Sequence, residues 1–597
     1  MKYTVRGTDA PAANSQPLRW LTIAAFGVAL YMIFAGLGQL ALIEPDEGRN
    51  AEVAREMAHA TEWSRAWLIP TLDGLPYMDK PAFYFKTVAL TFAAFGESET
   101  TARLSSALFG LLLLGMTYLF SRRVYNTRTA ALTVMIMVTA PLYFVFARLV
   151  IMDMTLAFFV CGAIFAGYLA EENDGARRAR WYLLASASAG VATLVKGPIG
   201  FFLPFLVLTC FNWLDGKRGF WKRYLAPWNV VLFLAIVLPW FLGASYFERD
   251  FAYYGLVRET FLRLTTGEFR RSGPMYYFVP WIIFGFLAWS LLLPEGILAA
   301  WKTRKGWHRA DRLFVVWSVA VFIFFSLSQS KRPDYILTII VSLGALVARI
   351  FDRAFERADS RAVRLVRRSA TALAILTMLT AMFVCLGGSR LDTWRAVFHL
   401  KPESAPWVIP TLPGVLVASL VVFVLAVVAS VRRNSWLAFA AFVLIAPLTG
   451  SAAFGGLKSY AESRSSRVLV QQFAPLPAGT EIACLDKVPT ALLFYLKQPI
   501  YAVCDSGYEL SSFYIGFKHK QTHSWPSVMV PRAKFAAWVG KQNHPVYVLA
   551  EEDGRAELEA VAAEHHAHIK ELPPDHWGAL IFPKNTGRTP SDSKGRR

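Results

Sequence analysis

Long apolar runs separated by short polar loops dominate the chain from residue 18 to about residue 453. Their lengths approach what a helix needs to cross a bilayer, which predicts a polytopic helical membrane protein. The thirteen predicted spans are 18–42, 103–120, 129–148, 154–170, 181–195, 198–213, 227–245, 276–297, 313–328, 335–350, 369–386, 409–430 and 435–453. Lys2, Arg6 and Arg19 precede the first apolar run, and no small-residue cleavage site follows, so we expect a retained anchor.

The distribution of Lys and Arg between the loops predicts the orientation. Counting the apolar run 82–96 as a span would place Arg122, Arg123 and Arg128 outside and invert every later loop. With that run left outside, the short inner loops carry 23 Lys and Arg residues and the short outer loops 12. The positive-inside rule then predicts a cytoplasmic N-terminus and an external C-terminal domain. The run 82–96 becomes an amphipathic helix on the outer surface.

Beyond residue 456 the pattern changes to that of a soluble domain. Short β-rich runs at 481–486, 499–504, 546–550 and 579–582, with a helix-like run at 555–566, predict a small α/β domain. The predicted organisation is a cytoplasmic tail 1–17, a transmembrane part 18–455 with a first outer loop 43–102, an external α/β domain 456–583 and a disordered basic tail 584–597.

Composition and charge agree with a membrane protein. Hydrophobic residues make up 55% of the chain, and the mean hydropathy is +0.38. The net charge of +20 is explained by Lys and Arg in inner loops, near anionic lipid, because we find no nucleic-acid-binding module. Five cysteines are too few for a disulfide scaffold, and pairing of Cys484 with Cys504 in the C-terminal domain is left open.

The segment Glu44-Pro45-Asp46-Glu47-Gly48-Arg49 directly follows the first span. Three carboxylates within four residues are poor anchors in lipid and suit a catalytic site at the membrane surface. Alternatively, the segment is only a helix start, with proline at the first position and acids that complement the helix dipole. That alternative explains where the acids lie but not why so many gather at a membrane boundary.

Other polar residues map to the same predicted side of the membrane. They are Lys80, Asp153, Lys196, Glu259, Arg263, Arg270, Lys331 and Tyr335. An ionisable residue in a membrane segment is a functional candidate, and a group on one face is stronger evidence than any single one. Taken alone, Lys196 and Lys331 could be interfacial residues whose head groups reach water, and Arg270 could be a loop charge.

Three segments place a cation just before a proline: Lys80-Pro81, Lys196-Gly197-Pro198 and Lys331-Arg332-Pro333. Such a proline can occupy the first turn of the next helix. A helix N-terminus offers free N–H groups and the positive end of a dipole. Three such ends around one cavity would hold a phosphate or pyrophosphate head group while its lipid tail stays in the bilayer.

In their order along the chain, these motifs resemble the signature of the lipid A aminoarabinose transferase family. The matching segments are the acidic motif with Ala51-Glu52 and Arg55-Glu56-Met57, then Lys80-Pro81, Arg103-Leu104-Ser105-Ser106 with Arg122-Arg123, Val195-Lys196-Gly197-Pro198 and Ser330-Lys331-Arg332-Pro333-Asp334-Tyr335. These enzymes are bacterial relatives of protein O-mannosyltransferases and have the GT-C fold. The resemblance covers roughly residues 18–350 and implies a polytopic α-helical membrane protein with about thirteen spans and an external C-terminal domain.

The resemblance also implies a reaction. The donor would be undecaprenyl phosphate carrying 4-amino-4-deoxy-L-arabinose, and the acceptor a phosphate of lipid A at the periplasmic face of the inner membrane. The product would oppose polymyxin and other cationic peptides. No cofactor is required; if a divalent metal takes part, His59 is the candidate ligand, as the one histidine near the acidic loop.

Residue roles follow from the same resemblance. Asp46 would be the central carboxylate at the anomeric carbon, with Asp153 as its partner and Glu47 as a further catalytic acid. The expected substrate-binding residues are Arg49, Arg55, Tyr77, Lys80, Lys196, Glu259, Arg263, Arg270, Lys331 and Tyr335. Among them Lys80, Arg263 and Lys331, with Arg270, would neutralise the phosphate of the leaving lipid.

Two departures from the family pattern keep other functions open. The residue after Glu259 is not the histidine common in relatives, and Asp153 lies between two methionines rather than before a proline. Another polyprenyl-phosphate-sugar transferase, acting on protein or a different glycan, is therefore an alternative. A transporter of lipid-linked sugar is a second one, although a transporter should carry its charges near the bilayer midplane on matched halves, whereas here they cluster at one end.

Overall fold

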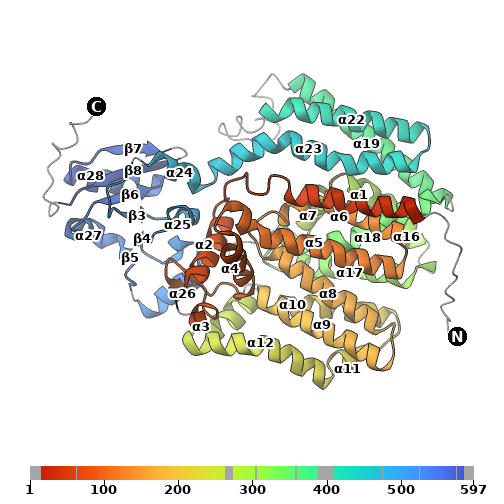
Figure 1. The fold of residues 1–597 in the computed structure, drawn as a ribbon, viewed down its shortest axis with the longest axis horizontal. Coiled ribbons are helices and arrows are strands. Elements are labelled where there is room, and N and C mark those ends of the chain that lie inside the picture. Colours follow the sequence, from red (N-terminus) through yellow and green to blue (C-terminus); the bar gives the residue numbers. More distant parts are fainter. Residues whose placement is uncertain are drawn as a thin grey trace.

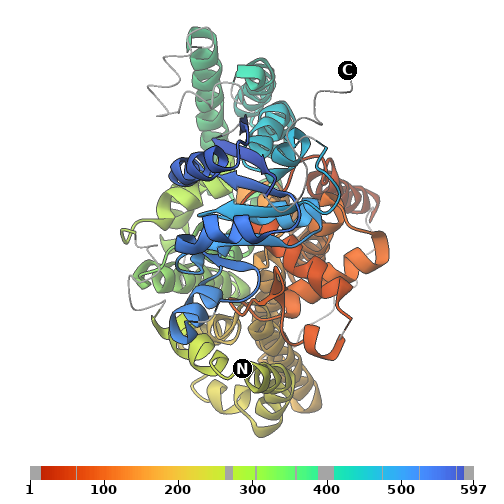
Figure 2. The same ribbon diagram turned by 90° about the vertical axis from the view of Figure 1, so that its left-hand side faces the viewer.

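The structure is a computed structural model that describes residues 15–61, 63–262, 273–302, 306–356, 359–387, 409–473, 475–523, 525–572 and 575–583. Within these ranges a long bundle of roughly parallel helices meets a mixed α/β domain at one end (Figure 1). Seen from that end, the α/β domain lies across the tips of the helices (Figure 2). The polytopic helical architecture with a C-terminal α/β domain is confirmed.

The helices of the bundle and its loops are α1 (Ser15–Phe34), α2 (Asp46–His59), α3 (Trp63–Ala66), α4 (Phe83–Phe95), α5 (Glu99–Val124), α6 (Thr127–Thr139), α7 (Pro141–Phe146), α8 (Asp153–Ala170), α9 (Gly175–Lys196), α10 (Ile199–Leu214), α11 (Phe220–Tyr224), α12 (Pro227–Phe247), α13 (Phe251–Tyr253), η1 (Tyr254–Leu262), α15 (Phe278–Phe286), η2 (Leu287–Leu292), α16 (Leu293–Lys302), α17 (Arg309–Leu327), η4 (Pro333–Ile336), α18 (Leu337–Phe355), α19 (Ser360–Gly387), η6 (Ile409–Thr411), α22 (Leu412–Val431) and α23 (Ser435–Ser463). Each predicted span overlaps at least one helix of the described chain, although the helix of the first span ends at Phe34 and the span 276–297 covers α15, η2 and α16. Ten helices there are long and apolar enough to cross a membrane, and α4, α6 and α10 are shorter apolar helices.

One predicted span, 129–148, is two helices rather than one. Pro141 lies at the first position of α7, where its missing N–H costs no hydrogen bond, and α6 ends just before it. Polar N-caps set other starts: Ser98 accepts a hydrogen bond from the Thr101 N–H at α5, and Asn126 accepts one from the Thr129 N–H at α6. These boundaries fix which side chains stand at the helix ends.

Loops predicted to share the inner side of the membrane do lie together. Arg128 pairs with Asp352 at 2.5 Å across two of them, and Arg309 pairs with Asp215 at 2.8 Å across another two. They gather at the end of the bundle away from the α/β domain (Figure 1). The alternation of loops inferred from Lys and Arg is therefore internally consistent, while the direction across a membrane stays a prediction.

The first outer loop lies between the bundle and the α/β domain (Figure 1). It holds α2, a hairpin of β1 (Thr71–Leu72) and β2 (Leu75–Pro76), and α4. The predicted helix at 82–96 is confirmed as α4, which packs against α2 and α5 and buries Tyr84, Phe85 and Val88. The loop is thus a packed layer of its own.

A buried ion pair fixes the loop to the bundle. Arg103 of α5, 2% exposed, donates two hydrogen bonds to Glu47 at 2.9 and 2.8 Å. Its remaining donors bond the backbone carbonyls of Leu37, Leu40 and Ala41. Glu47 is equally satisfied, because it also accepts from backbone N–H groups. A buried charge pair of this kind is tolerated only when its hydrogen bonds are made.

The α/β domain is built on a six-stranded sheet in the order β5-β4-β3-β6-β8-β7. Its elements are α24 (Ser466–Gln472), β3 (Glu481–Leu485), α25 (Thr490–Leu496), β4 (Ile500–Cys504), η7 (Tyr508–Leu510), α26 (Phe513–Thr522), β5 (Met529–Pro531), η8 (Arg532–Lys534), α27 (Phe535–Lys541), β6 (Val546–Ala550), η9 (Glu552–Gly554), α28 (Arg555–Glu564), β7 (Ile569–Leu572) and β8 (His576–Ile581). Strands β5, β4, β3 and β6 are parallel, with Ala483 opposite both Tyr501 and Val548, and β8 and β7 are antiparallel.

The four predicted strands and the predicted helix at 555–566 are confirmed as β3, β4, β6, β8 and α28. Strands β5 and β7 escaped prediction for physical reasons. The first has only three residues and ends in a proline, and the second exposes Lys570 and Glu571 at the sheet edge, so it shows no run of apolar residues. Cys484 and Cys504 are buried on neighbouring strands and both are free thiols.

The turn of the β1–β2 hairpin carries a buried carboxyl at the boundary with the α/β domain. Asp73 accepts a hydrogen bond from the Ile500 N–H at 3.3 Å, and Glu56 accepts one from the Asp73 N–H at 2.6 Å. Burial, with a smaller contribution from the charge of Glu56, raises the pKa of Asp73 to about 8. Burial, together with the charge of Glu52, raises the pKa of Glu56 to about 7.

Breaking the buried pair should destabilise the protein. Arg103→Leu leaves Glu47 buried without its cation, which costs about 3–5 kcal/mol of unfolding free energy. The control Arg178→Gln removes a cation from the exposed pair with Asp174, which is worth about 0–1 kcal/mol. Thermal unfolding of the purified proteins in detergent should show a large fall for the first and little change for the second. Equal midpoints would contradict a structural role for the pair.

The Asp73 carboxyl predicts a pH dependence of stability. Because its pKa is higher folded than unfolded, the folded state holds a proton that the unfolded state has lost between about pH 4 and about pH 8, and stability falls as pH rises through that window. Asp73→Asn imitates the protonated form, so its unfolding midpoint should fall less over the same window. A slope identical to that of the parent would contradict the assignment.

Candidate functional site

Asp46 is the first residue of α2, at the end of the bundle that faces the α/β domain. Its two carboxylate oxygens lie against different cations: Arg49 Nη2 at 2.5 Å and Arg332 Nη2 at 3.2 Å. Burial alone would raise the pKa of Asp46, but the charges of Arg49 and Arg332 outweigh it and hold the pKa below its ordinary value. Asp46 is therefore an ionised carboxylate near neutral pH.

Asp46 begins a continuous row of alternating charges, which we call the charge chain. Arg332 Nε bonds Asp334 at 2.9 Å, and the other oxygen of Asp334 lies 2.8 Å from Lys196 Nζ. Lys196 Nζ also bonds Asp153. Asp334 and Asp153 keep only 1% and 5% of their side-chain exposure, so each needs its cation to stay ionised.

Helix boundaries position the members of the charge chain. Asp153 is the first residue of α8, and Lys196 is the last of α9, where Gly197 leaves the helix with φ +77°. Pro333 occupies the first position of η4, as predicted. The other two prolines of the Lys-Pro segments fall just before their helices, Pro198 next to α10 and Pro81 two residues before α4.

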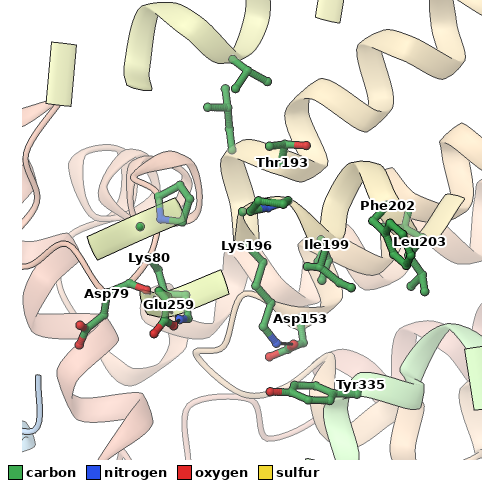
Figure 3. A pocket seen from close by; sticks show the side chains of 18 of the residues that line it. Asp79, Lys80, Asp153, Thr193, Lys196, Ile199, Phe202, Leu203, Glu259 and Tyr335 are labelled. Atoms are coloured by element: carbon green, nitrogen blue, oxygen red, sulfur yellow. Dashed lines mark hydrogen bonds and ion pairs between the residues drawn. The ribbon is translucent and has the colours of Figure 1, made fainter. Parts of the chain in front are cut away.

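A cavity of about 470 Å³ lies beside the charge chain, and we call it the first cavity. Its charged end carries Lys80, Asp153, Lys196, Glu259 and Asp334. Its other walls are apolar side chains from α10, α12 and α17, among them Phe202, Leu203, Trp240, Phe241, Phe324 and Phe325. Figure 3 shows Lys196 reaching toward Asp153, with Tyr335 beside them and the Lys80–Glu259 pair at the opposite side. The cavity thus joins a charged head to an apolar body.

The cations of the first cavity already have protein partners. Lys80 Nζ bonds Glu259 and donates to the Asp79 carbonyl at 2.7 Å. Lys196 Nζ lies 5.2 Å from the centre of the Tyr335 ring as well as against its two carboxylates. Each ammonium is consequently held in place before any ligand arrives.

A second cavity, of about 650 Å³, is lined by Asp46 and Arg332, the members at one end of the charge chain, whereas Asp334, Lys196 and Asp153 line the first. The bundle contributes Pro45, Asp46, Arg49, Tyr277, Lys331 and Arg332, and the α/β domain contributes Tyr508, Ser511, Ser512 and Phe513. Arg49 donates to the Ser511 carbonyl at 2.8 Å, yet its buried Nε has no hydrogen-bond acceptor within the described part of the chain. Because that nitrogen is closed to solvent, Arg49 contributes its positive charge to the cavity rather than this N–H.

Several predicted site residues lie elsewhere. Glu47, expected as a catalytic acid, is buried in the ion pair with Arg103 and lines neither cavity. Arg55, expected to bind substrate, makes two bonds to Glu52 at 2.8 and 2.7 Å. Tyr77 is buried beneath Arg49, whose guanidinium lies 5.8 Å from its ring centre.

Two more predicted residues, Arg263 and Arg270, lie outside the described residues. Lys331 lines the second cavity, but its ammonium donates to the Ser328 carbonyl at 2.5 Å. Its neighbours in the sequence, Arg332 and Asp334, enter the charge chain instead. Both belong to the motif Ser330–Tyr335 that the sequence analysis identified. Its alternating positive and negative residues were the feature from which their place in the site could have been predicted.

In the described part of the chain, His59 is not joined by enough further side chains to form a metal site. His59 stands at the far end of α2, 65% exposed, and contacts Glu97. Among the residues that the structure describes, no group of three or more His, Cys, Asp or Glu side chains could hold a metal ion. The donor set around His59 therefore does not fit a divalent metal site.

Comparison with known proteins gives similarities to one group of enzymes. The family described as dolichyl-phosphate-mannose-protein mannosyltransferase matches residues 79–242. The undecaprenyl phosphate-alpha-4-amino-4-deoxy-L-arabinose arabinosyl transferase of Wigglesworthia glossinidia brevipalpis is 28% identical over 56% of this chain and 58% of that protein. The enzyme of the same name from Shewanella sediminis is 27% identical over 89% of this chain and 93% of that protein.

The first two relatives, from Wigglesworthia glossinidia brevipalpis and Edwardsiella ictaluri, each match over 58% of their own length, and the chain covers more of some others. Among solved structures, the crystal structure of ArnT from Cupriavidus metallidurans bound to undecaprenyl phosphate has a TM-score of 0.79 and 27% identity. That similarity covers 97% of this chain and 100% of that one. The apo structure of the same protein has a TM-score of 0.76.

Proposed function

Because the chain belongs to the ArnT family of GT-C membrane glycosyltransferases, we propose that it moves 4-amino-4-deoxy-L-arabinose from undecaprenyl phosphate to a phosphate of lipid A. The reaction would take place at the periplasmic face of the bacterial inner membrane. The added ammonium would offset negative charge on the acceptor and so oppose polymyxin and other cationic peptides. The observation that carries the proposal is the first cavity, which joins cations to an apolar body.

The first cavity suits the polyprenyl phosphate. An isoprenoid tail needs apolar walls, which the side chains of α10, α12 and α17 provide. Its phosphate needs cations at the end of those walls, where Lys80 and Lys196 stand. The solved relative holds undecaprenyl phosphate, which supports the same class of ligand here.

The second cavity suits the acceptor phosphate. Arg49 and Arg332 line it, and their guanidinium charges would attract an oxyanion. The hydroxyl groups of Ser511, Ser512 and Tyr508 add neutral donors for the sugar or its acceptor. Donor and acceptor would thus approach from the two cavities, with the charge chain between them.

In the proposed transfer, the bond between the anomeric carbon and the donor phosphate oxygen breaks. A bond from that carbon to an oxygen of the acceptor phosphate forms, and undecaprenyl phosphate leaves with the electron pair. A phosphate acceptor is already anionic near neutral pH, so little deprotonation is needed. Asp46 would orient the acceptor or the sugar ammonium and stabilise positive charge on the anomeric carbon, while Lys80 would stabilise the leaving phosphate.

Asp153 and Asp334 would act through Lys196 and Arg332 rather than on the sugar. Because the carboxylates fix these cations, the positive charge is oriented before the reaction begins, which lowers the reorganisation needed in the transition state. Arg263 and Arg270 keep their predicted role in binding the leaving phosphate. No step in this scheme requires a cofactor.

A second candidate function is transfer of a polyprenyl-linked sugar to protein. The match of residues 79–242 to the protein mannosyltransferase family favours it. With a hydroxyl acceptor, Asp46 would have to act as general base. The two functions differ in acceptor, so one experiment separates them.

Mass spectrometry of lipid A tests the proposed function. In cells that lack their own aminoarabinose transferase, the parent chain should add the mass of one aminoarabinose to lipid A, and Asp46→Asn should add none. Loss of one preorganised charged group costs about 2.7–4 kcal/mol of barrier, or about 10²–10³-fold in rate. The control Asp174→Asn removes an exposed carboxylate far from the site and should behave like the parent.

An unmodified lipid A from cells that contain folded parent protein would refute the proposed acceptor. New glycoprotein bands in those cells would then favour the protein-directed alternative. Normal modification by Asp46→Asn would instead refute the role of Asp46.

The charge chain predicts a pH effect. Arg332→Gln removes one of the two cations that hold the pKa of Asp46 low, so that pKa should rise. If ionised Asp46 is needed, the acid limb of the kcat/KM profile should move to higher pH, whereas the exposed control Arg555→Gln should leave it in place. A lower rate with an unmoved acid limb would show that Arg332 serves the reaction in another way.

A further inference from the structure

Glu44, two residues before Asp46, is held by the C-terminal domain. Its carboxylate accepts hydrogen bonds from the Ser466 hydroxyl, from the Thr490 hydroxyl at 3.1 Å and from the Ala491 N–H at 3.1 Å. The Thr490 hydroxyl also lies 2.9 Å from the Pro45 carbonyl, so its single proton is shared between the two oxygens. The residues just before the central carboxylate are therefore tied to the loop and first turn that follow strand β3.

Asp79, the residue before Lys80, is held by the same domain at a neighbouring place. Its carboxylate accepts from the N–H groups of Phe513 and Tyr514, at 2.9 and 2.7 Å, in the first turn of α26. It also accepts from the Tyr254 hydroxyl at 2.6 Å. The residue next to Lys80 is therefore tied to the first turn of the helix that follows strand β4.

The two contacts share one edge of the sheet. In doubly wound α/β domains the turns beyond the carboxyl ends of the parallel strands bind anionic ligands. Here β3 and β4 are adjacent parallel strands, and the groups that their following turns receive are carboxyl side chains of the first outer loop. Glu44 lies two residues before Asp46, which lines the second cavity, and Asp79 directly precedes Lys80, which lines the first.

From this geometry we infer that Glu44 and Asp79 are positioning residues, through which the C-terminal domain sets the places of Asp46 and Lys80. The inference rests on the proposed function, because it assigns a task to residues beside that site. Glu44 lines neither cavity. Asp79 lines the first cavity, but both of its carboxylate oxygens accept hydrogen bonds from the protein, so we assign it to positioning rather than to substrate binding. A misplacement of about 1 Å at a reacting group can cost about 10²-fold in rate.

Removing the two contacts should affect different kinetic constants. Glu44→Ala frees the segment that holds Asp46, so kcat should fall by about 10- to 100-fold with little change in the KM for donor. Asp79→Ala frees the segment that holds Lys80, so binding of undecaprenyl phosphate itself should weaken and the donor KM should rise about tenfold. A general loss of folding would instead lower the fraction of active protein and leave KM unchanged in both.

Conservative variants sharpen the test, because the donors around the two carboxylates differ. In Glu44→Gln the amide oxygen can accept from Ala491, and the amide NH2 can donate to Thr490, whose own proton goes to Pro45. In Asp79→Asn an NH2 group must face one of two backbone N–H donors, which cannot reverse. Glu44→Gln should therefore restore kcat, whereas Asp79→Asn should resemble Asp79→Ala.

Matched controls separate positioning from domain attachment. Glu248 bonds Lys518 and the Tyr514 hydroxyl, and Glu99 bonds Arg467 and the Tyr495 hydroxyl, so both join the same two parts of the chain, and neither lines a cavity or lies within two residues of Asp46 or Lys80. Glu248→Gln and Glu99→Gln should leave kcat and donor KM within about twofold of the parent. If they reduce kcat as much as Glu44→Ala does, attachment alone explains the effect and the inference fails.

A glycine offers a route to the same displacement without changing a charge. A Cβ on Gly48 would lie 2.5 Å from the Ala491 backbone, so Gly48→Ala must push α2 and the C-terminal domain apart. The control Gly115→Ala places its methyl where no atom lies within 4 Å. The first should lower kcat as Glu44→Ala does and the second should not; an unchanged kcat in Gly48→Ala would overturn the inference.

A readout without turnover keeps this inference distinct from the proposed function. In full-length protein in detergent, Glu44→Ala should speed amide hydrogen exchange in peptides covering 43–60, relative to the parent and to Glu99→Gln. If the parent fails to modify lipid A but exchange responds as expected, the proposed acceptor is wrong and the positioning contact stands. Unchanged exchange together with parental kcat would overturn the contact itself.

Discussion

The arrangement of the site depends on one constraint, the pairing of each buried member of the charge chain with an opposite charge. Asp153 and Asp334 are nearly closed to solvent, and each would be neutral without a cation beside it. Lys196 and Arg332 supply these cations. Asp334 in turn fixes the Arg332 guanidinium, which lies against Asp46 and favours its ionised form. Because each member of the charge chain fixes the next, the two cavities have a common wall whose charges are set before any ligand binds.

The C-terminal domain, like the helices of the bundle, contributes residues to the site. It lines the second cavity with Tyr508, Ser511, Ser512 and Phe513, and it receives Glu44 and Asp79 at the turns beyond two parallel strands. The edge of the sheet that binds anionic ligands in other α/β domains here receives carboxyl side chains of the same chain. The first outer loop is thus clamped from both sides, by the Arg103–Glu47 pair toward the bundle and by these carboxylates toward the sheet.

The helices and the general place of the site could be predicted from the sequence, because membrane spans need long apolar runs and charged residues at their ends stand out against them. The finer assignment could not. Glu47 and Asp46 are neighbours of the same chemical type, and only the position of Arg103 decides that one is enclosed and the other faces a cavity. The contribution of Ser511 and Phe513 to the second cavity could not be predicted, because separation in sequence does not show which loops lie together in the fold.

Contacts between the first outer loop and the C-terminal domain can form only after the C-terminal domain has been synthesised. Asp46 is synthesised near the beginning of the chain, while Ala491 and Phe513, whose amides help to hold its loop, follow only after α23, the last helix of the bundle. Contacts between such distant segments form late, since a long loop must close first. A nascent or truncated chain would therefore carry its charged residues in the membrane without a finished catalytic centre, and the transferase would become competent only as a complete polypeptide.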